Sequence, residues 1–238
     1  MGAERDTLSA GAGQDSVSAG LGDTADGGEG TDTLGYSFAG SGVGITINTA
    51  SLIAPGGVTL GGGTLSNFEK LAFVVGSNFA DTITVDATTS GLTVQGGGGN
   101  DTIRAAGEVS HILGGAGDDQ LYGGAGADIF YYTPGNLGAD TIFDFGASDK
   151  LDLSALLIPD LTTLLLYTRQ VGSDVVIGFK SAGEDFSITL KAITIAQITP
   201  FNLALYRVTD PLSLLGTDGD DTLFGNLARD TLNGLGGN

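Results

Sequence analysis

The 238-residue chain contains no cysteine, no tryptophan, a single histidine and only nine basic residues. Without cysteine it can form no disulfide, no thiolate metal site and no thiol nucleophile. One histidine is too few for the paired histidines of a zinc-protease motif. The 28 acidic residues give a formal net charge of −19, which argues against nucleic acid and anionic membranes as partners.

Long hydrophobic runs are also missing. No apolar stretch follows Met1, so the sequence predicts no N-terminal signal peptide. The most apolar region, 153–167, is interrupted by Pro159 and Asp160 and cannot span a bilayer. We therefore expect a soluble chain with no membrane insertion.

Glycine and aspartate are abundant instead. The chain has 42 glycines, and 23 of its 28 acidic residues are Asp rather than Glu. This combination is typical of turns and not of helices. Hydrophobic residues make up 41% of the chain and recur at fixed spacing, which argues against disorder.

Nine-residue repeats of the form G-G-x-G-x-D-x-U-x, in which U is a large apolar residue, organise the chain. Three copies are complete: GGGGNDTIR at 96–104, GGAGDDQLY at 114–122 and GGAGADIFY at 123–131. The U positions of this region are nine residues apart, at Ile103, Ile112, Leu121 and Phe130. Looser copies lie at 1–9, 10–18, 27–35, 76–84, 135–143, 216–224 and 225–233.

The repeats divide the chain into five segments. We expect an N-terminal repeat array at 1–42, a β-strand insertion at 43–75, a main roll at 76–145, a β-rich capping segment at 146–212, and the start of a further, truncated array at 213–238. Alternation predicts short strands at 45–47, 58–60 and 71–75, and an antiparallel pair at 175–179 and 186–190. Residues 161–167 fit either a strand or a short helix.

Each nonapeptide suits one half-turn of a flattened coil. Glycines at positions 1, 2 and 4 allow positive φ and a tight turn, and positions 7 to 9 form a short strand whose middle residue faces inward. Two units complete one turn, so loops 18 residues apart, such as those of Asp101 and Asp119, stack on one edge. Stacked carboxylates and carbonyls form an all-oxygen site that suits Ca²⁺. The sequence therefore predicts several calcium ions whose binding drives folding.

These nonapeptides resemble the RTX, or haemolysin-type, calcium-binding repeats of bacterial exoproteins, over roughly half of the chain. The resemblance implies an all-β fold, a calcium-binding parallel β-roll with interspersed and capping antiparallel strands. It also implies a secreted or cell-surface location reached by type I secretion.

The resemblance further implies a ligand set. In the family, one loop supplies the carbonyls of positions 2 and 4 and the Asp of position 6, and the loop stacked on it supplies the carbonyls of positions 1 and 3 and its own Asp. The best site implied here combines Gly97, Gly99 and Asp101 with Gly114, Ala116 and Asp119. A second combines Ser77, Phe79 and Asp81 with Gly96, Gly98 and Asp101. A third combines Gly115, Gly117 and Asp119 with Gly135, Leu137 and Asp140 across a three-residue insertion.

Two further sites are implied elsewhere. On the opposite edge Ser110 replaces Asp, so Ala106 and Glu108 with Gly123, Ala125 and Asp128 form a weak site or none. The N-terminal array offers Gly11, Gly13 and Asp15 with Gly27, Glu29 and Asp32, at a spacing one residue short of 18.

Other conspicuous side chains have simpler explanations. We expect Asp118, Asp218, Asp220 and His111 to face solvent, because they lie outside positions 6 and 8. The aromatic run 130–132 suits an edge cap better than a sugar-stacking platform. The acidic pairs among Asp144, Asp149 and Asp152 lack the cleft that a glycosidase needs.

Two functions of different classes follow. The first is a non-catalytic calcium-binding module that acts as a scaffold, surface-layer or adhesin unit. The alternative is a carbohydrate-binding accessory module of an extracellular polysaccharide-modifying enzyme of the alginate epimerase or lyase type. The candidate partners are calcium, polysaccharide and neighbouring copies of the array through head-to-tail self-association; an enzyme in its own right is disfavoured, because the chain has no catalytic motif.

Overall fold

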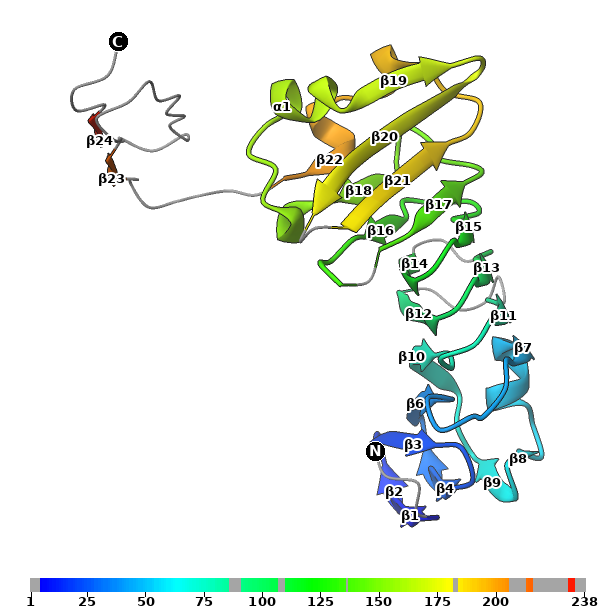
Figure 1. The fold of residues 1–238 in the computed structure, drawn as a ribbon. Coiled ribbons are helices and arrows are strands. Elements are labelled where there is room, and N and C mark those ends of the chain that lie inside the picture. Colours follow the sequence, from blue (N-terminus) through cyan, green and yellow to red (C-terminus); the bar gives the residue numbers. More distant parts are fainter. Residues whose placement is uncertain are drawn as a thin grey trace.

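The computed structural model describes residues 5–85, 91–106, 110–135, 137–181, 184–205, 213–215 and 231–233. Within these residues the protein is a stack of short β-strands that begins at the N-terminus and ends in a broader cap (Figure 1). From β10 to β18 the chain passes back and forth between two faces of this stack, so that consecutive strands lie on opposite faces and strands two apart pair with each other.

One face is an eight-stranded sheet in which all pairs are parallel, here called the first sheet. Its strands are β3 (Ser16–Gly20), β6 (Thr33–Ser37), β10 (Lys70–Val75), β12 (Leu92–Gly98), β14 (Ser110–Ala116), β16 (Ile129–Tyr131), β18 (Lys150–Asp152) and β22 (Leu203–Ala204).

The opposite face is divided between two sheets. The second sheet holds β7 (Thr46–Asn48), β11 (Thr82–Thr84), β13 (Thr102–Arg104), β15 (Gln120–Tyr122), β17 (Ala139–Ile142), β21 (Glu184–Leu190), β20 (Asp174–Ser181) and β19 (Thr168–Val171). The third sheet serves the N-terminal coils with β1 (Thr7–Ser9), β4 (Thr24–Asp26), β9 (Gly63–Ser66) and β8 (Val58–Leu60). Two-stranded parallel sheets join β2 (Ala12–Gly13) to β5 (Glu29–Gly30) and β23 (Ser213–Leu215) to β24 (Thr231–Asn233).

The register confirms the nine-residue phase of the main roll. Ile112 lies opposite Val94 and Phe130, and Leu121 lies opposite Ile103, so strands 18 residues apart pair without a slip. The loosely matching coils pair at other separations: Ile83 with Ile103, and Leu121 with Ile142. Insertions of two or three residues are absorbed in the loops, because the inward-facing residues keep their places in the core.

The apolar U residues form the core. Side chains from both faces are buried to 0–1% exposure: Ile83, Val94, Ile103, Ile112, Leu121, Phe130, Ile142 and Leu151. A strand of three residues buries its middle side chain and leaves the two neighbours outside. Each coil therefore contributes one apolar side chain per face to one continuous core.

The interspersed segment 43–75 contributes to the roll itself. Its strands β7 and β10 pair in parallel with roll strands, and only β8 and β9 form an antiparallel hairpin. A 3₁₀-helix at Thr49–Ile53 buries Leu52 under this hairpin. The expected insertion thus supplies the strands that join the N-terminal array to the main roll.

The cap closes the other end of the stack with antiparallel strands. β20 pairs with β21 and β19 with β20, as the alternation of this segment predicted for its central pair. The ambiguous residues 161–167 form helix α1 (Leu161–Leu166), because the Asp160 side chain caps its first turn by accepting the Thr163 N–H at 2.7 Å. Short 3₁₀-helices complete the cap at Ser154–Leu156, Ile195–Gln197 and Pro200–Asn202.

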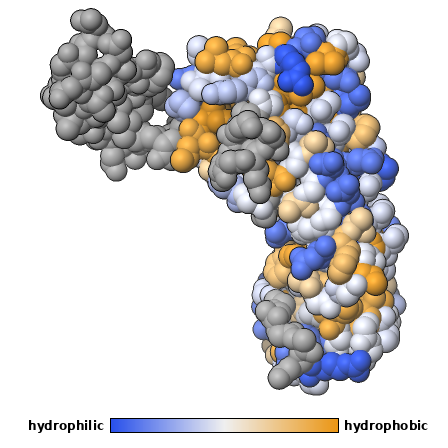
Figure 2. Space-filling model, in the orientation of Figure 1, coloured by the Kyte–Doolittle hydropathy of each residue, from blue (hydrophilic) through white to orange (hydrophobic). Residues whose placement is uncertain are grey.

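Exposed apolar side chains gather on this cap. Figure 2 shows hydrophobic residues at the end of the stack where α1 and β22 lie, and others over the coils nearer the N-terminus. Six large side chains there are exposed: Leu157, Leu165, Leu166, Tyr167, Val171 and Phe201. Among the described residues, no helix has the length and apolar character that crossing a bilayer requires.

Candidate metal sites

The acidic residues of position 6 lie at the two edges of the roll, directly before a strand or at its start. On the first edge Asp81, Asp101 and Asp119 directly precede strands of the second sheet, and Asp140 is the second residue of β17 in that sheet. On the second edge Asp15, Asp32, Asp128 and Asp149 precede strands of the first sheet, with Ser110 and Glu69 in the same role. The strand register therefore stacks them in two columns.

Hydrogen bonds link the members of each column. One carboxylate oxygen in each coil accepts the backbone N–H of the corresponding residue in the coil below. On the first edge the donors and acceptors are Asp81 to Asp101 (2.8 Å), Asp101 to Asp119 (2.8 Å) and Asp119 to Asp140 (2.9 Å). On the second edge they are Asp15 to Asp32, Asp32 to Glu69, Ser110 to Asp128 and Asp128 to Asp149.

The other carboxylate oxygen is left open in five coils. Oδ2 is buried and has no hydrogen-bond partner in Asp15, Asp32, Asp101, Asp119 and Asp128. A buried, unpaired carboxylate oxygen is costly because it has lost water and gained nothing in exchange. A cation bound beside it removes that cost, so these five atoms fit a metal site.

The loops of Asp101 and Asp119 show what surrounds such an oxygen. A Cβ at Gly96 would collide with both Asp101 Oδ2 and the Gly114 carbonyl oxygen, so these two oxygens share the space that glycine leaves free. The Gly97 and Gly99 carbonyls of the lower loop point at Gly115 and Gly117 of the upper loop. Carboxylate and carbonyl oxygens thus converge between the two loops, which is the donor set that calcium prefers.

Burial perturbs the carboxylates in the metal-free structure. Desolvation raises the pKa of Asp101 to about 7, and the charges of Asp119, Asp81 and Asp140 add to this. It likewise raises the pKa of Asp119 and Asp128 to about 6 and that of Asp140 to about 7. The folded roll therefore disfavours its own negative charge until a cation compensates for it.

Glycine at positions 2 and 4 distinguishes the open loops from the closed ones. All five open loops carry glycine at both positions, and every one of these glycines has a positive φ: Gly11, Gly13, Gly28, Gly30, Gly97, Gly99, Gly115, Gly117, Gly124 and Gly126. In three other loops Oδ2 accepts an N–H from its own loop: Gly20 to Asp23, Ser77 to Asp81 and Gly146 to Asp149. None of those three loops has glycine at position 2 or 4.

The structure brings the residues of the second implied site together in a closed form. Asp81 and Asp101 are neighbours in the column, and Gly98 donates to the Ser77 carbonyl at 3.0 Å. The Asp81 carboxylate is already bound, because it accepts both the Ser77 N–H (2.5 Å) and the Ser77 hydroxyl (2.8 Å). Phe79 has its backbone next to Gly99.

In the third implied site, Asp140 lies above Asp119, and Gly138 lies against the Gly117 carbonyl. Gly135 has a positive φ of 84°, and the side chain of Leu137 is buried in the core. The three-residue insertion puts Gly138 over the lower loop.

The N-terminal loops are stacked as the resemblance implied. Glu29 donates to the Gly11 carbonyl at 2.8 Å, and Gly30 packs on the Gly13 carbonyl. Asp15 and Asp32 lie in adjacent coils, and Gly27 faces Asp32 Oδ2.

On the second edge of the main roll, Ser110 lies below Asp128, and its hydroxyl is buried without a partner. Gly123 borders Asp128 Oδ2, and Gly124 packs on Ala105 and Ala106; Glu108 lies outside the described residues. Ala125 is exposed at the turn between them. Asp218 and Asp220 of the last array, which we expected to face solvent, also lie outside the described residues.

Three position-6 residues were missed by the repeat pattern. Asp149 continues the second edge above Asp128, Asp23 lies above Asp6 in the third sheet, and Glu69 lies above Asp32. Their loops lack the glycine pattern, and the signal that locates them is an acidic residue two positions before a buried apolar one: Leu151, Ala25 and Leu71.

Asp118 lies outside the column but forms hydrogen bonds to the neighbouring coils. It is exposed, and its Oδ1 accepts the Ala139 N–H at 2.8 Å, while its own N–H donates to the Asn100 side chain at 3.0 Å. Position 5 therefore forms a second, solvent-facing link between coils, which the sequence did not reveal.

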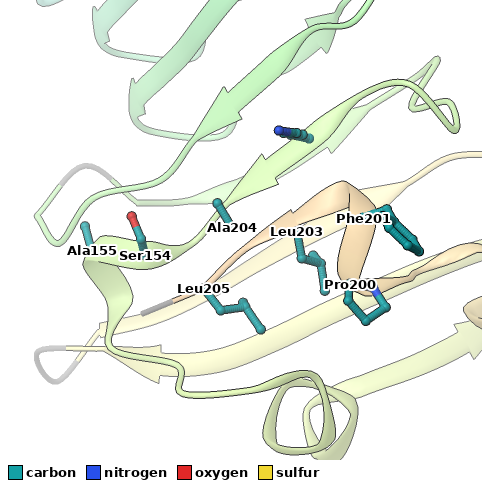
Figure 3. Close-up of a pocket in the computed structure, with 8 residues that line it drawn as sticks. Ser154, Ala155, Pro200, Phe201, Leu203, Ala204 and Leu205 are labelled. Carbon is teal, nitrogen blue, oxygen red and sulfur yellow. The ribbon is translucent and has the colours of Figure 1, made fainter. Parts of the chain in front are cut away.

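No group of three or more acidic or histidine side chains capable of holding a metal occurs within the described ranges. A cavity of about 680 Å³ lies elsewhere, beside β22 (Figure 3). Its described lining includes Lys150, Ser154, Phe201 and Leu203 and no acidic residue, so it is not a calcium site.

The nonapeptide repeats of the chain match the model of a known protein family. The model of the RTX calcium-binding nonapeptide repeat matches in four copies, at residues 2–24, 93–108, 110–142 and 213–238. A solved structure of the AlgE6R2 subunit from the Azotobacter vinelandii mannuronan C5-epimerase aligns with 28% identity and a TM-score of 0.47, over 58% of this chain and 94% of that one. The extracellular lipase LipA from Serratia marcescens aligns with 21% identity and a TM-score of 0.47, over 86% of this chain and 40% of the lipase. No curated protein sequence matches the chain.

Proposed function

Because this chain carries RTX calcium-binding nonapeptide repeats, we propose that it is a non-catalytic module of a secreted or cell-surface bacterial protein that folds on calcium after export. In this role it acts as a scaffold, surface-layer or adhesin unit. Calcium is the cofactor of these repeats, and their number implies several ions.

The observation that carries the proposal is the set of five buried Oδ2 atoms without a partner. In the calcium-poor cytoplasm each would be a buried, repelling charge, so the roll would not be stable there. Outside the cell, millimolar calcium neutralises them, and the binding free energy becomes folding free energy.

Circular dichroism of the whole chain tests calcium-coupled folding. We expect the β signal to rise as calcium is added through about 0.1–1 mM, the range of extracellular calcium modules. A chain with identical spectra in excess chelator and in calcium would overturn the proposal. Detection of the parent protein only in the cytoplasm of the source bacterium would overturn the location.

A second candidate is a carbohydrate-binding module, and a row of side chains outside the second sheet favours it. The Arg104 guanidinium lies 4.1 Å from the centre of the Tyr122 ring, which stacks on Phe143 at 4.5 Å with an interplanar angle of 4°. Half-buried rings beside a cation suit the apolar faces and acidic groups of a polysaccharide.

Pull-down on acidic and neutral polysaccharides in calcium distinguishes the two candidates. If the row binds glycan, Tyr122→Ala abolishes retention, whereas Tyr131→Ala, on the outside of the first sheet, does not. If the wild-type chain is retained on no polysaccharide, the carbohydrate-binding candidate is refuted and the scaffold function remains.

A further inference from the structure

We propose that one calcium ion binds between Asp32 and Glu69, at a place that the nonapeptide repeats do not encode. Here the chain reaches the second edge again after residues 33–68, and the ion clamps this point to the N-terminal array. The repeat matches leave this region out, since they end at residue 24 and resume at 93. The inference rests on the proposed calcium function and adds a ligand set to it.

Asp32 supplies an open oxygen that points away from the repeat site below it. The residue is completely buried. Its Oδ1 accepts the Asp15 N–H at 2.8 Å and so faces the lower coil, whereas Oδ2 has no partner. Because the lower site already uses the Asp15 side, the open oxygen belongs to the space above.

The space above Asp32 repeats the arrangement at the best repeat site. A Cβ at Gly27 would collide with the Asn67 carbonyl oxygen and lie 3.0 Å from Asp32 Oδ2. At Gly96 the same two roles belong to the Gly114 carbonyl and Asp101 Oδ2. Asn67 therefore provides the carbonyl that a repeat would take from its first glycine.

Glu69 takes the place of the upper aspartate. Its Oε2 accepts the Asp32 N–H at 2.8 Å, the same bond that Asp119 makes to Asp101. The Glu69 and Lys70 N–H groups both donate to the Asp32 carbonyl, at 3.1 and 3.0 Å, and fix this residue over the lower loop. The upper segment 67–69 is three residues shorter than the loop 27–32, and the longer glutamate side chain makes up the distance.

The Asn67 carbonyl is held in place without a metal. Asn67 has a φ of 57°, a left-handed conformation that asparagine tolerates. Its side-chain amide donates to Asp26 Oδ1 at 2.7 Å, and the same oxygen accepts the Gly28 N–H at 3.1 Å. Asp26 thus ties the upper and lower segments together and aims the carbonyl at Asp32. Two carboxylates and preset carbonyls form a hard oxygen site for a divalent cation of calcium size.

Ion counting on the full chain tests the assignment. Native mass spectrometry and calorimetry at saturating calcium give the number of bound ions for the wild type and four variants. We expect Glu69→Gln to lose one ion, Asp15→Asn to lose one, and Asp32→Asn to lose two, since its oxygens face both sites. Glu184→Gln, a matched charge change at the start of β21 in the cap, is expected to lose none.

Equal ion counts and affinities for wild type and Glu69→Gln would overturn the inference, as would the loss of only one ion in Asp32→Asn. A wild type that binds no calcium would instead overturn the proposed function. A calcium-bound crystal structure of the wild type needs no variant. Anomalous density within about 2.3–2.6 Å of Asp32 Oδ2 and the Asn67 oxygen supports the site, and filled repeat sites with no density there refute it.

Discussion

Replacing Asp119 with asparagine keeps the size and the Oδ1 acceptor of the side chain but removes its charge. Asp119 is 1% exposed, and it stands between two coils. Its Oδ1 accepts the Asp101 N–H from the coil below, its N–H donates to Asp140 Oδ1 in the coil above, and its Oδ2 has no partner. The substitution therefore weakens two calcium sites at once.

The expected loss follows from counting those sites. An ion present at 10 to 100 times its dissociation constant stabilises the folded state by about 1.4–2.7 kcal/mol, so two ions contribute about 3–5 kcal/mol. A domain of ordinary stability has about 5–15 kcal/mol in total. Asp119→Asn should accordingly raise the calcium midpoint of folding severalfold and lower the melting temperature in calcium.

Asp118→Asn is the matched control. It makes the same charge change one residue away, and the amide oxygen can still accept the Ala139 N–H, as the Asn100 side chain does for Asp118. We expect its calcium midpoint and stability to stay within about 0.5 kcal/mol of wild type. Both variants are compared by calcium titration followed by circular dichroism. If Asp118→Asn shifts the midpoint as far as Asp119→Asn, the assigned register is wrong and the ligand sets fall with it.

Three more predictions concern the same sites. Burial raises the pKa of Asp101 and Asp140 to about 7 in the fold without calcium, so that fold is most stable below the ordinary Asp pKa and loses stability as the pH rises through 7. Circular dichroism in chelator should therefore show more β structure at pH 5 than at pH 8. The calcium midpoint of folding should be higher at pH 5, because protons then compete with calcium for the carboxylates. Gly96→Ala puts a methyl group where Asp101 Oδ2 and the Gly114 oxygen meet, so it should raise the calcium midpoint, whereas Gly42→Ala, which meets nothing within 4 Å, should not; equal midpoints would contradict the site geometry. Magnesium should not replace calcium in folding titrations, because it requires a smaller octahedral site, and equal folding in both ions would show that the sites are not of calcium type.

The sequence predicted the roll because its apolar residues keep strict phase. Ile103 and Leu121 face each other 18 residues apart, and Ile112 and Phe130 do so on the other face. Where the phase shifts, the strands still pair, as Leu121 does with Ile142, and Gly138 lies over the Gly117 carbonyl, a contact that the repeat positions did not predict. Loops absorb an insertion in ways that the spacing alone does not determine.

The sequence did not predict which residues outside the repeat pattern take the places of repeat residues. Glu69 takes the position-6 place although its segment, 67–69, contains no glycine. The 36 residues that separate it from Asp32 contain no complete repeat, so the spacing did not predict its place in the column. The Ser77 N–H and hydroxyl both donate to the Asp81 carboxylate. The presence of Ser in place of Gly at this repeat position did not predict these hydrogen bonds. The hydrogen bonds of Glu69 and Ser77 depend on which groups the folded chain places within hydrogen-bond distance, and the sequence does not give those distances.

Glycine at positions 2 and 4 explains why some coils need calcium and others do not. With positive φ at both places, as in Gly97 and Gly99, the loop turns its carbonyls toward the next coil and leaves Asp101 Oδ2 open. With side chains there, as in the loop of Asp149, the Gly146 N–H turns inward and binds Oδ2 at 2.7 Å. Loops of the first kind lack the internal hydrogen bond to Oδ2 and leave that oxygen free for a cation. Loops of the second kind form the internal hydrogen bond and leave no free oxygen.

The two kinds of loop occupy different places in the roll. On the first edge the closed loop of Asp81 comes before the open loops of Asp101 and Asp119, and on the second edge the open loop of Asp128 comes before the closed loop of Asp149. Repulsion between neighbouring carboxylates is greatest in the middle of a column, since each carboxylate there has an acidic residue on both sides. In the main roll the open loops of Asp101 and Asp119 therefore lie where the charges are densest, and the loops of Asp81 and Asp149 on either side are held by hydrogen bonds that need no cation.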